Sequence, residues 1–314
     1  MLQVVGEPRR IDRAVKRLQG ALKGVPSRGV RLTWRGGELR TTIHWLRDDG
    51  FWWAFEPRED GRRPRDALLL GHAPHPPGKR ESITCEINLS RAGADRKVAG
   101  IVAADAAGAL YLAHSGRMGG ARAGQGKRGF RDFLADGVWR PVAWPDGAET
   151  EALVIAPLDS PRLVRLLGRF VADVHRFKTG AIRDGRTRLC VEPSTHDSVA
   201  AACDRHLVDL ALHEELAKRG LFGGTVDLFS LRGRRPQPLF ALVAAGQPEE
   251  LALAVGSLSL ASARGGSAVR PILVAPAHLD ADDAAALRTL PFACVRYRWR
   301  GARAIFDGLD DALE

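Results

Sequence analysis

The sequence predicts an α+β protein with a β-rich N-terminal half and a C-terminal half in which helices and strands alternate. Short apolar runs with period-two alternation dominate residues 30–155, which is typical of antiparallel strands. From residue 161 onward, apolar residues at helical spacing alternate with short apolar runs, as in mixed α/β domains. A chain of 314 residues is also long enough for two domains.

The N-terminal half opens with a helix and a set of three strands. Apolar residues at helical spacing predict a helix over residues 9–23, and its opposite face is basic. Residues 30–55 indicate a three-stranded antiparallel meander, because turn-forming residues lie at 36–37 and 48–50. Residues 57–81 are rich in Pro, Gly and Arg, and we expect a long surface loop there. Further strands are expected at residues 82–89, 97–103, 109–114, 139–144 and 151–155.

The C-terminal half begins with two long helices. Apolar residues share one face of residues 161–178, with Ser160 as the N-cap, and a second helix over residues 197–219 ends at Gly220. Later elements are expected at residues 225–231, 238–244, 248–263, 269–275, 280–289 and 292–299. Counted from the helix at residues 197–219, the order α-β-β-α-β-α-β indicates a mixed α/β domain. We therefore divide the chain into a basic β-rich domain (1–158), a helical linker (159–196) and an α/β domain (197–314).

Positive charge is concentrated in the N-terminal half. Residues 1–150 carry 26 Lys and Arg against 17 Asp and Glu, whereas residues 151–314 carry 21 against 20. Six of the seven tryptophans also lie within residues 1–150. A basic, Trp-rich half predicts a polyanionic partner. Nucleic acid is the first choice, with DNA ahead of RNA, and an anionic membrane surface is the second.

Nothing in the sequence predicts export or a membrane span. No run of 18 apolar residues is free of charge, and the first ten residues lack the apolar segment of a secretory signal. The cysteines are scattered without the spacing of a disulfide framework or a zinc site. We expect reduced thiols in a cytoplasmic protein. The cysteines are Cys85, Cys190, Cys203 and Cys294.

The most distinctive local feature is the glycine-rich basic segment of residues 114–130. Its glycines let backbone N–H groups approach an anion closely, and the basic side chains between them can hold phosphates. Arg128 replaces the Ser or Thr that a P-loop needs for Mg²⁺, so we do not expect an ATPase. A solvated basic loop without a fixed ligand is the alternative. The candidate nucleic-acid-binding residues in this segment are His114, Arg117, Arg122, Lys127 and Arg128.

Trp52 is a further candidate for nucleic-acid binding. Within the strand expected at residues 51–55, Trp52 points to the opposite face from its aromatic neighbours. Together with Trp34 or Trp45 on neighbouring strands, it is a candidate stacking platform for an extruded base. Core packing is the alternative, because a small β domain needs large apolar residues.

A group of polar residues is also expected around the strand at residues 82–89. Glu86 and Asn88 alternate onto one face of this strand, and His114 and Lys97 are candidate neighbours. The spacing of these residues matches no metal-binding motif, so we expect no metal site there.

The C-terminal half carries residues that suggest a known nuclease architecture. Val226-Asp227-Leu228 follows the helix at residues 197–219, and the next strand reads Leu239-Phe-Ala-Leu-Val-Ala-Ala-Gly246 before another helix. In this order of elements, residues 197–310 resemble the PD-(D/E)XK nuclease superfamily, the restriction-endonuclease-like fold. The resemblance implies that Asp227 occupies the position of a metal-binding carboxylate and that the following strand should carry Glu-x-Lys.

The departures from the family pattern decide the expected chemistry. Ala241, Val243 and Ser257 stand where the family has Glu, Lys and Gln. Such nucleases need at least two carboxylates to hold Mg²⁺, so Asp227 alone gives no useful site. We expect an inactive domain with no metal and no cofactor, in which Asp227 is vestigial or merely a turn-facing or capping carboxylate. The alternative is an active Mg²⁺-dependent DNase, in which Glu249 or Glu250 has taken over from the missing ligand.

The first function hypothesis is a nucleic-acid-binding protein of the bacterial restriction or defence type. The β-rich half reads DNA, a modified or flipped base being one target, and the nuclease-like half serves as a scaffold. The second hypothesis is the active DNase. The third is an interaction protein whose degenerate nuclease domain forms a homodimer and whose basic half meets RNA or another anion.

Overall fold

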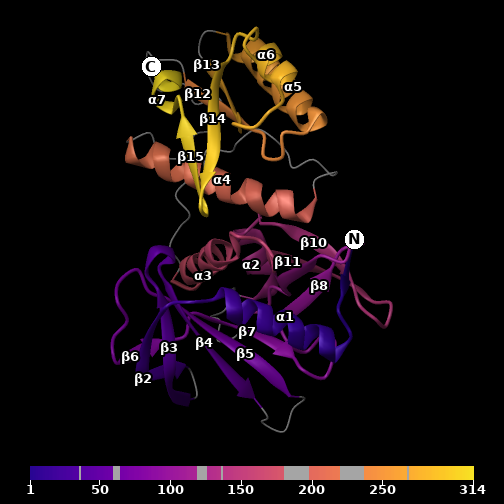
Figure 1. Ribbon diagram of the computed structural model, residues 1–314, viewed down its shortest axis with the longest axis vertical. Helices are drawn as coiled ribbons and strands as arrows, with labels where there is room; N and C mark the ends of the chain where they lie inside the picture. Colours follow the sequence, from indigo (N-terminus) through magenta and orange to yellow (C-terminus); the bar gives the residue numbers. More distant parts are fainter. Residues whose placement is uncertain are drawn as a thin grey trace. The chain divides into compact units, whose positions relative to one another are not determined.

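The computed structural model divides into two compact units, Met1–Ile182 and Arg183–Glu314. Figure 1 shows that each unit contains both helices and strands, which confirms the predicted α+β class. The structure describes residues 1–34, 37–58, 64–118, 126–135, 137–179, 198–219, 237–266 and 269–314.

The first unit contains a closed five-stranded barrel. Its strand order is β1-β10-β11-β9-β8. The short strand β1, which the sequence analysis did not predict, pairs in parallel with β10 and antiparallel with β8 and thereby closes the barrel. Three residues are too few for period-two alternation to be recognised. The strands are β1 (Leu2–Val4), β8 (Gly100–Ala104), β9 (Leu110–His114), β10 (Trp139–Ala143) and β11 (Glu149–Pro157).

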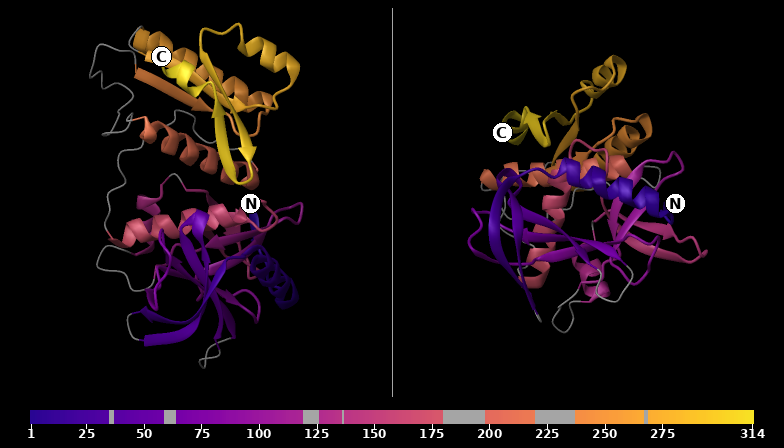
Figure 2. Two further views of the ribbon diagram at one scale, coloured as in Figure 1. Left: turned by 60° about the vertical axis from the view of Figure 1, so that its left-hand side comes forward. Right: turned by 60° about the horizontal axis from the view of Figure 1, so that its bottom comes forward.

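The second sheet of the first unit is curled so far that its two edges meet the same segment. Its strand order is β6-β2-β3-β4-β5-β7. The N–H of Ile83 donates to the carbonyl of Thr33 in β2, next to the edge strand β6, and the N–H of Thr84 donates to the carbonyl of Leu70 in β5, next to the edge strand β7. The indigo strands bend accordingly in Figure 2. The strands are β2 (Val25–Trp34), β3 (Gly37–Leu46), β4 (Phe51–Arg58), β5 (Arg65–His72), β6 (Arg80–Ser82) and β7 (Cys85–Ser90), with the short 3₁₀ helix η1 (Arg47–Asp49) before β4.

The expected surface loop at residues 57–81 is wrong, because β5 and β6 both lie within it. Strand β5 pairs with β4 on one side and β7 on the other, and Ala67, Leu68, Leu69 and Leu70 are all buried. A strand buried on both faces lacks the alternation that marks a half-buried strand. The Pro, Gly and Arg residues on either side of β5 are typical of loops, and they led to the prediction of a loop.

Trp52 lies inside the curled sheet and is fully buried, so its prediction as an exposed stacking platform is wrong. It packs in an apolar cluster with Val30, Leu32 and Ile43. Its indole covers Gly71, the residue opposite it on β5, so closely that a Cβ on Gly71 would overlap the ring atom Cε2. Trp52 is instead a core residue that fills the interior of the sheet.

Three helices complete the first unit: α1 (Pro8–Ala21), α2 (Lys127–Phe133) and α3 (Leu163–Thr179). Helix α3 packs against β11 of the barrel and β5 of the curled sheet. Phe170 contacts the ring of His114, and Gly168 lies against Phe51. Helix α3 is thus part of the first unit's core, and the expected linker at 159–196 is not supported over these residues.

The second unit contains a four-stranded sheet in the order β12-β13-β14-β15, covered on both faces by helices. The first three strands are parallel, and β15 is antiparallel. One apolar cluster joins the sheet to α4 and α7, and another joins its other face to α5 and α6. The strand predicted at residues 225–231 lies outside the described residues. The elements are α4 (Val199–Lys218), β12 (Gln237–Leu242), α5 (Pro248–Gly265), β13 (Val269–Pro276), α6 (Ala281–Leu287), β14 (Ala293–Arg300), β15 (Arg303–Asp307) and α7 (Leu309–Leu313).

Among the helices that the structure describes, none combines the length and the apolar character needed to cross a membrane.

The contact between Trp52 and Gly71 predicts a strong response to a single added methyl group. Gly71→Ala should lower the free energy of unfolding by about 1–3 kcal/mol, because the methyl group has no space beside the indole. The measurement is urea denaturation followed by tryptophan fluorescence. Gly20→Ala is the control, since nothing lies within 4 Å of its added Cβ and it should be neutral or stabilising. Equal effects of the two substitutions would contradict the packing described.

Candidate nucleic-acid interface

The structure brings together residues from the two ends of the glycine-rich segment. Gly116 has a φ of +80°, and a Cβ on it would lie 3.4 Å from Cγ of Lys127. Arg117 is exposed, and its Nη1 donates to the carbonyl of Arg96 at 3.2 Å. The side chain of Arg128, in the first turn of α2, is 97% exposed. Arg122 and the glycines around it lie outside the described residues.

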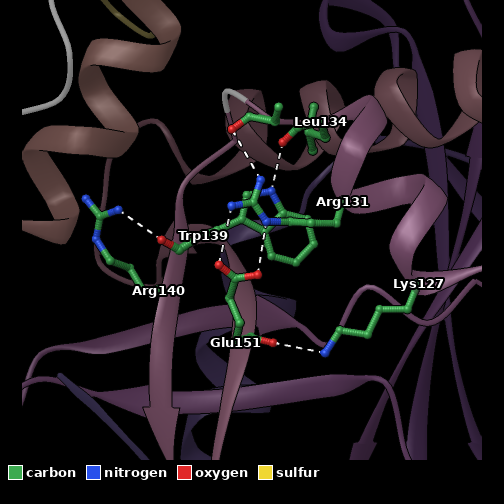
Figure 3. Close-up of polar contacts among 7 residues, drawn as sticks. Lys127, Arg131, Leu134, Trp139, Arg140 and Glu151 are labelled. Carbon is green, nitrogen blue, oxygen red and sulfur yellow. Dashed lines mark hydrogen bonds and ion pairs between the residues drawn. The ribbon is translucent and has the colours of Figure 1, made fainter.

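Helix α2 is fixed to the barrel by a polar clamp (Figure 3). Nε and Nη2 of Arg131 donate to the carboxylate of Glu151 at 3.0 and 3.4 Å, and the guanidinium lies 5.0 Å from the centre of the Trp139 ring. Nε1 of Trp139 donates to the carbonyl of Leu134 at 2.8 Å, and Nζ of Lys127 donates to the carbonyl of Glu151 at 3.3 Å. The clamp engages Arg131, while the exposed Arg128 lies 4.0 Å from the carboxylate of Asp132.

Helix α1 presents a second basic surface, which the site prediction missed. Ile11, Ala14, Val15 and Leu18 are buried, and the opposite face carries exposed basic residues. Lys16 pairs with Asp12 at 2.8 Å. Arg9, Arg13 and Arg17 are exposed and have no carboxylate partner among the described residues. The sequence indicates this surface, because basic residues recur at helical spacing opposite the apolar face. We call Arg9, Arg13 and Arg17 the α1 basic face.

His114 is buried rather than available to a ligand, so the structure does not support it as a nucleic-acid contact. Its Nδ1 accepts a hydrogen bond from the N–H of Gly116 at 3.0 Å, and its ring packs against Phe170. Burial and, to a lesser extent, the positive charge of Lys178 lower the pKa of His114 to about 4. The side chain is therefore a neutral structural group that shapes the start of the glycine-rich segment.

In the second unit, Glu250 is buried in the first turn of α5 and holds the preceding loop. Its carboxylate accepts hydrogen bonds from the N–H groups of Ala244, Ala245 and Gly246 at 2.7, 2.8 and 3.2 Å. It also forms an ion pair with Arg205 at 2.5 Å. These four donors occupy the oxygens that a metal would need, which is the role of a structural carboxylate.

The remaining residues of the predicted nuclease centre give no assembled site in the described part of the chain. Asp227 lies outside the described residues. Glu249 is exposed, while Ala241 and Val243 are fully buried in the cluster beneath α5. Where the structure describes the chain, no three His, Cys, Asp or Glu side chains are grouped so that they could hold a metal ion.

The buried neutral His114 predicts a pH-dependent stability of the first unit. Its folded pKa of about 4 lies below its ordinary value of 6.5, so the unfolded chain binds more protons between these values. Stability should fall as the pH drops from 6.5 toward 4. Between pH 7 and pH 5 the expected loss is about 2 kcal/mol from this residue.

Urea denaturation followed by tryptophan fluorescence at both pH values measures this loss, since six of the seven tryptophans lie within residues 1–150. His114→Gln should flatten the pH dependence, whereas the exposed His75→Gln should leave it unchanged. The same pH dependence in all three proteins would show that His114 does not titrate as described. His72, whose pKa is lowered by burial and by the nearby charges of His175 and Arg176, should add to the loss in acid.

The contacts of Glu250 predict that it stabilises the second unit. Glu250→Ala should cost about 3–5 kcal/mol, because it leaves Arg205 without this carboxylate and three loop N–H groups without an acceptor. Glu249→Ala is the matched control and should change stability by less than about 0.5 kcal/mol. Denaturation followed by far-UV circular dichroism provides the comparison. A Glu250 variant as stable as the Glu249 variant would contradict a structural role.

No family model, no curated protein and no solved structure matches this chain.

Proposed function

We propose that the protein binds nucleic acid through the phosphate backbone, using basic surfaces of the first unit. The observation that carries this proposal is the α1 basic face, whose three arginines are exposed and unpaired with carboxylates among the described residues. Arg117, Lys127 and Arg128 add a second basic surface beside α2. Exposed cations in excess over carboxylates attract polyanions, and their phosphate contacts release condensed counterions.

Double-stranded DNA is the preferred partner, and the second unit is proposed as an inactive nuclease-like scaffold of a restriction or defence protein. Parallel strands with helices on both faces are compatible with the restriction-endonuclease-like resemblance. Ala241 and Val243, at the positions of the family's Glu and Lys, pack into the apolar core instead of facing a site. These features support binding without cleavage.

The competing proposal, an Mg²⁺-dependent DNase that uses Glu250, is disfavoured by the contacts of that residue. A metal would have to displace Arg205 and at least one loop N–H from its carboxylate. Incubating the protein with supercoiled plasmid and Mg²⁺ tests this alternative directly. Nicking that is abolished by EDTA and by Glu250→Gln would replace the binding proposal with the enzymatic one.

The salt dependence of duplex binding tests the backbone-binding proposal. If Arg9, Arg13 and Arg17 each contact one phosphate, changing all three to Ala should flatten the slope of log K against log salt by about 3 units. The measurement is fluorescence anisotropy with a labelled duplex at several salt concentrations. The loss should be similar for unrelated sequences, because phosphate contacts do not read bases.

A second triple variant, with Arg117, Lys127 and Arg128 changed to Ala, reports on the surface beside α2 in the same titration. The control is a triple variant of exposed arginines in the second unit, Arg264, Arg300 and Arg303. It should leave the slope unchanged. A slope that changes as much in this control, or in none of the variants, would refute binding through the first unit.

A further inference from the structure

The inner face of the curled sheet is apolar at one end and polar at the other. Residues directly opposite each other in neighbouring strands share a face, and alternate residues of one strand do so as well. Trp52, Glu56 and Arg58 therefore lie on one face of β4. The register places Ala67 of β5 between Glu56 and Asn88 of β7. Ala67, which separates those two polar residues, is itself fully buried.

Six side chains at this end form what we call the inner polar cluster. Oγ1 of Thr41 donates to Glu56 at 2.5 Å, and Nδ2 of Asn88 donates to Glu86 at 3.2 Å. Nη2 of Arg58 lies 4.0 Å from Oε1 of Glu86, and its guanidinium lies 5.5 Å from the centre of the Trp34 ring. The members of the cluster are Trp34, Thr41, Glu56, Arg58, Glu86 and Asn88.

The inner polar cluster has hydrogen-bonding capacity that its own contacts leave unused. Nη2 of Arg58 and Oδ1 of Asn88 are buried atoms that have no hydrogen-bond partner among the residues that the structure describes. Buried polar atoms are normally hydrogen-bonded, so a donor and an acceptor without partners point to a missing one. The side chains of Arg58 and Glu86 are 24% and 32% exposed, so solvent and small groups reach the cluster.

The chemistry of the cluster selects a planar ligand with both donors and acceptors on its edge. The ring of Trp34, over which the Arg58 guanidinium also lies, is the aromatic surface of the cluster. Asn88 and Arg58 offer an acceptor and a donor, and two carboxylates accept hydrogen bonds. A nucleobase that carries an amino group satisfies this set. Thymine satisfies it less well, because its carbonyl oxygens would face carboxylates. A concave inner face also excludes a base that remains stacked in a duplex.

We propose that the inner polar cluster binds a single amino-bearing nucleobase extruded from a duplex. This inference rests on the proposed function, since the basic surfaces hold the duplex from which the base is taken. It places the base-binding site at Trp34, Glu56, Glu86 and Asn88 rather than at the buried Trp52. Base binding here needs no metal and no covalent chemistry.

The test compares three duplexes that differ only at one central pair: matched, C·C mismatched and T·T mismatched. Both mismatches lower the cost of extrusion, but only the first offers an amino group. The full-length protein should bind the C·C duplex at least about fivefold more tightly than the matched one. The T·T duplex should show less than half of that gain. Equal binding of the two mismatched duplexes would overturn the inference.

Variants then locate the site. The double variant Glu56→Gln and Glu86→Gln should abolish the C·C preference while keeping the salt slope of the wild type. Trp34→Ala should abolish it as well, which provides a second route if the double variant does not fold. Glu38→Gln, an exposed carboxylate on β3 outside the cluster, is the matched control and should retain the preference.

The outcomes separate the two proposals. Salt-dependent binding of all three duplexes without a C·C preference overturns the base-binding site and leaves the proposed function standing. A preference that survives both the double variant and Trp34→Ala also overturns it, because the base then binds elsewhere. A protein that binds none of the duplexes overturns the proposed function and the base-binding site together.

Discussion

The hydrogen bonds of Ile83 and Thr84 determine the shape of the first unit. Consecutive residues of one segment bond to β2 through Thr33 and to β5 through Leu70, so the six-stranded sheet must curl. Curling turns one face of the sheet into an interior. Trp52 is buried because of this closure. Its indole covers residue 71 so closely that only glycine fits there. The polar residues at the far end become a partly enclosed cluster. A flat sheet of the same strands would leave all of these groups in solvent.

Much of this fold could be predicted from local patterns, and the exceptions have physical causes. Helix α1 and the meander of β2, β3 and β4 follow directly from periods of 3.6 and 2 in the apolar residues. Strand β5 does not, because Ala67 to Leu70 are buried on both faces and show no alternation. Strand β1 is too short to carry a pattern, and its pairing with β8 and β10 is set by residues far along the chain.

The candidate sites were predictable to a smaller degree. Charge and helical spacing reveal the α1 basic face, and glycine content marks the segment that follows β9. The burial of Trp52 and His114 could not be read from the sequence, since an aromatic residue on a strand fits either face until the sheet's curvature is known. The contact of Glu86 with Asn88 follows from their alternation along one strand, whereas its contact with Arg58 was hidden, because the fold and not sequence proximity brings these two side chains together. Glu250 shows the converse, a carboxylate that looked free for a metal but is occupied by its own loop.

The closure of the barrel by β1 has a consequence for the order of folding. The partners of β1 are Ala103 and Ala104 in β8 and Val142 and Ala143 in β10, so the barrel cannot close during synthesis until residue 143 has left the ribosome. The strands β2 to β5 are consecutive antiparallel neighbours and need only local contacts. The curled sheet is therefore free to form early, while Leu2 and Val4 remain unpaired for most of the first unit's synthesis. During that interval β1 and, once it has been synthesised, β8 present open strand edges that can pair with other strands.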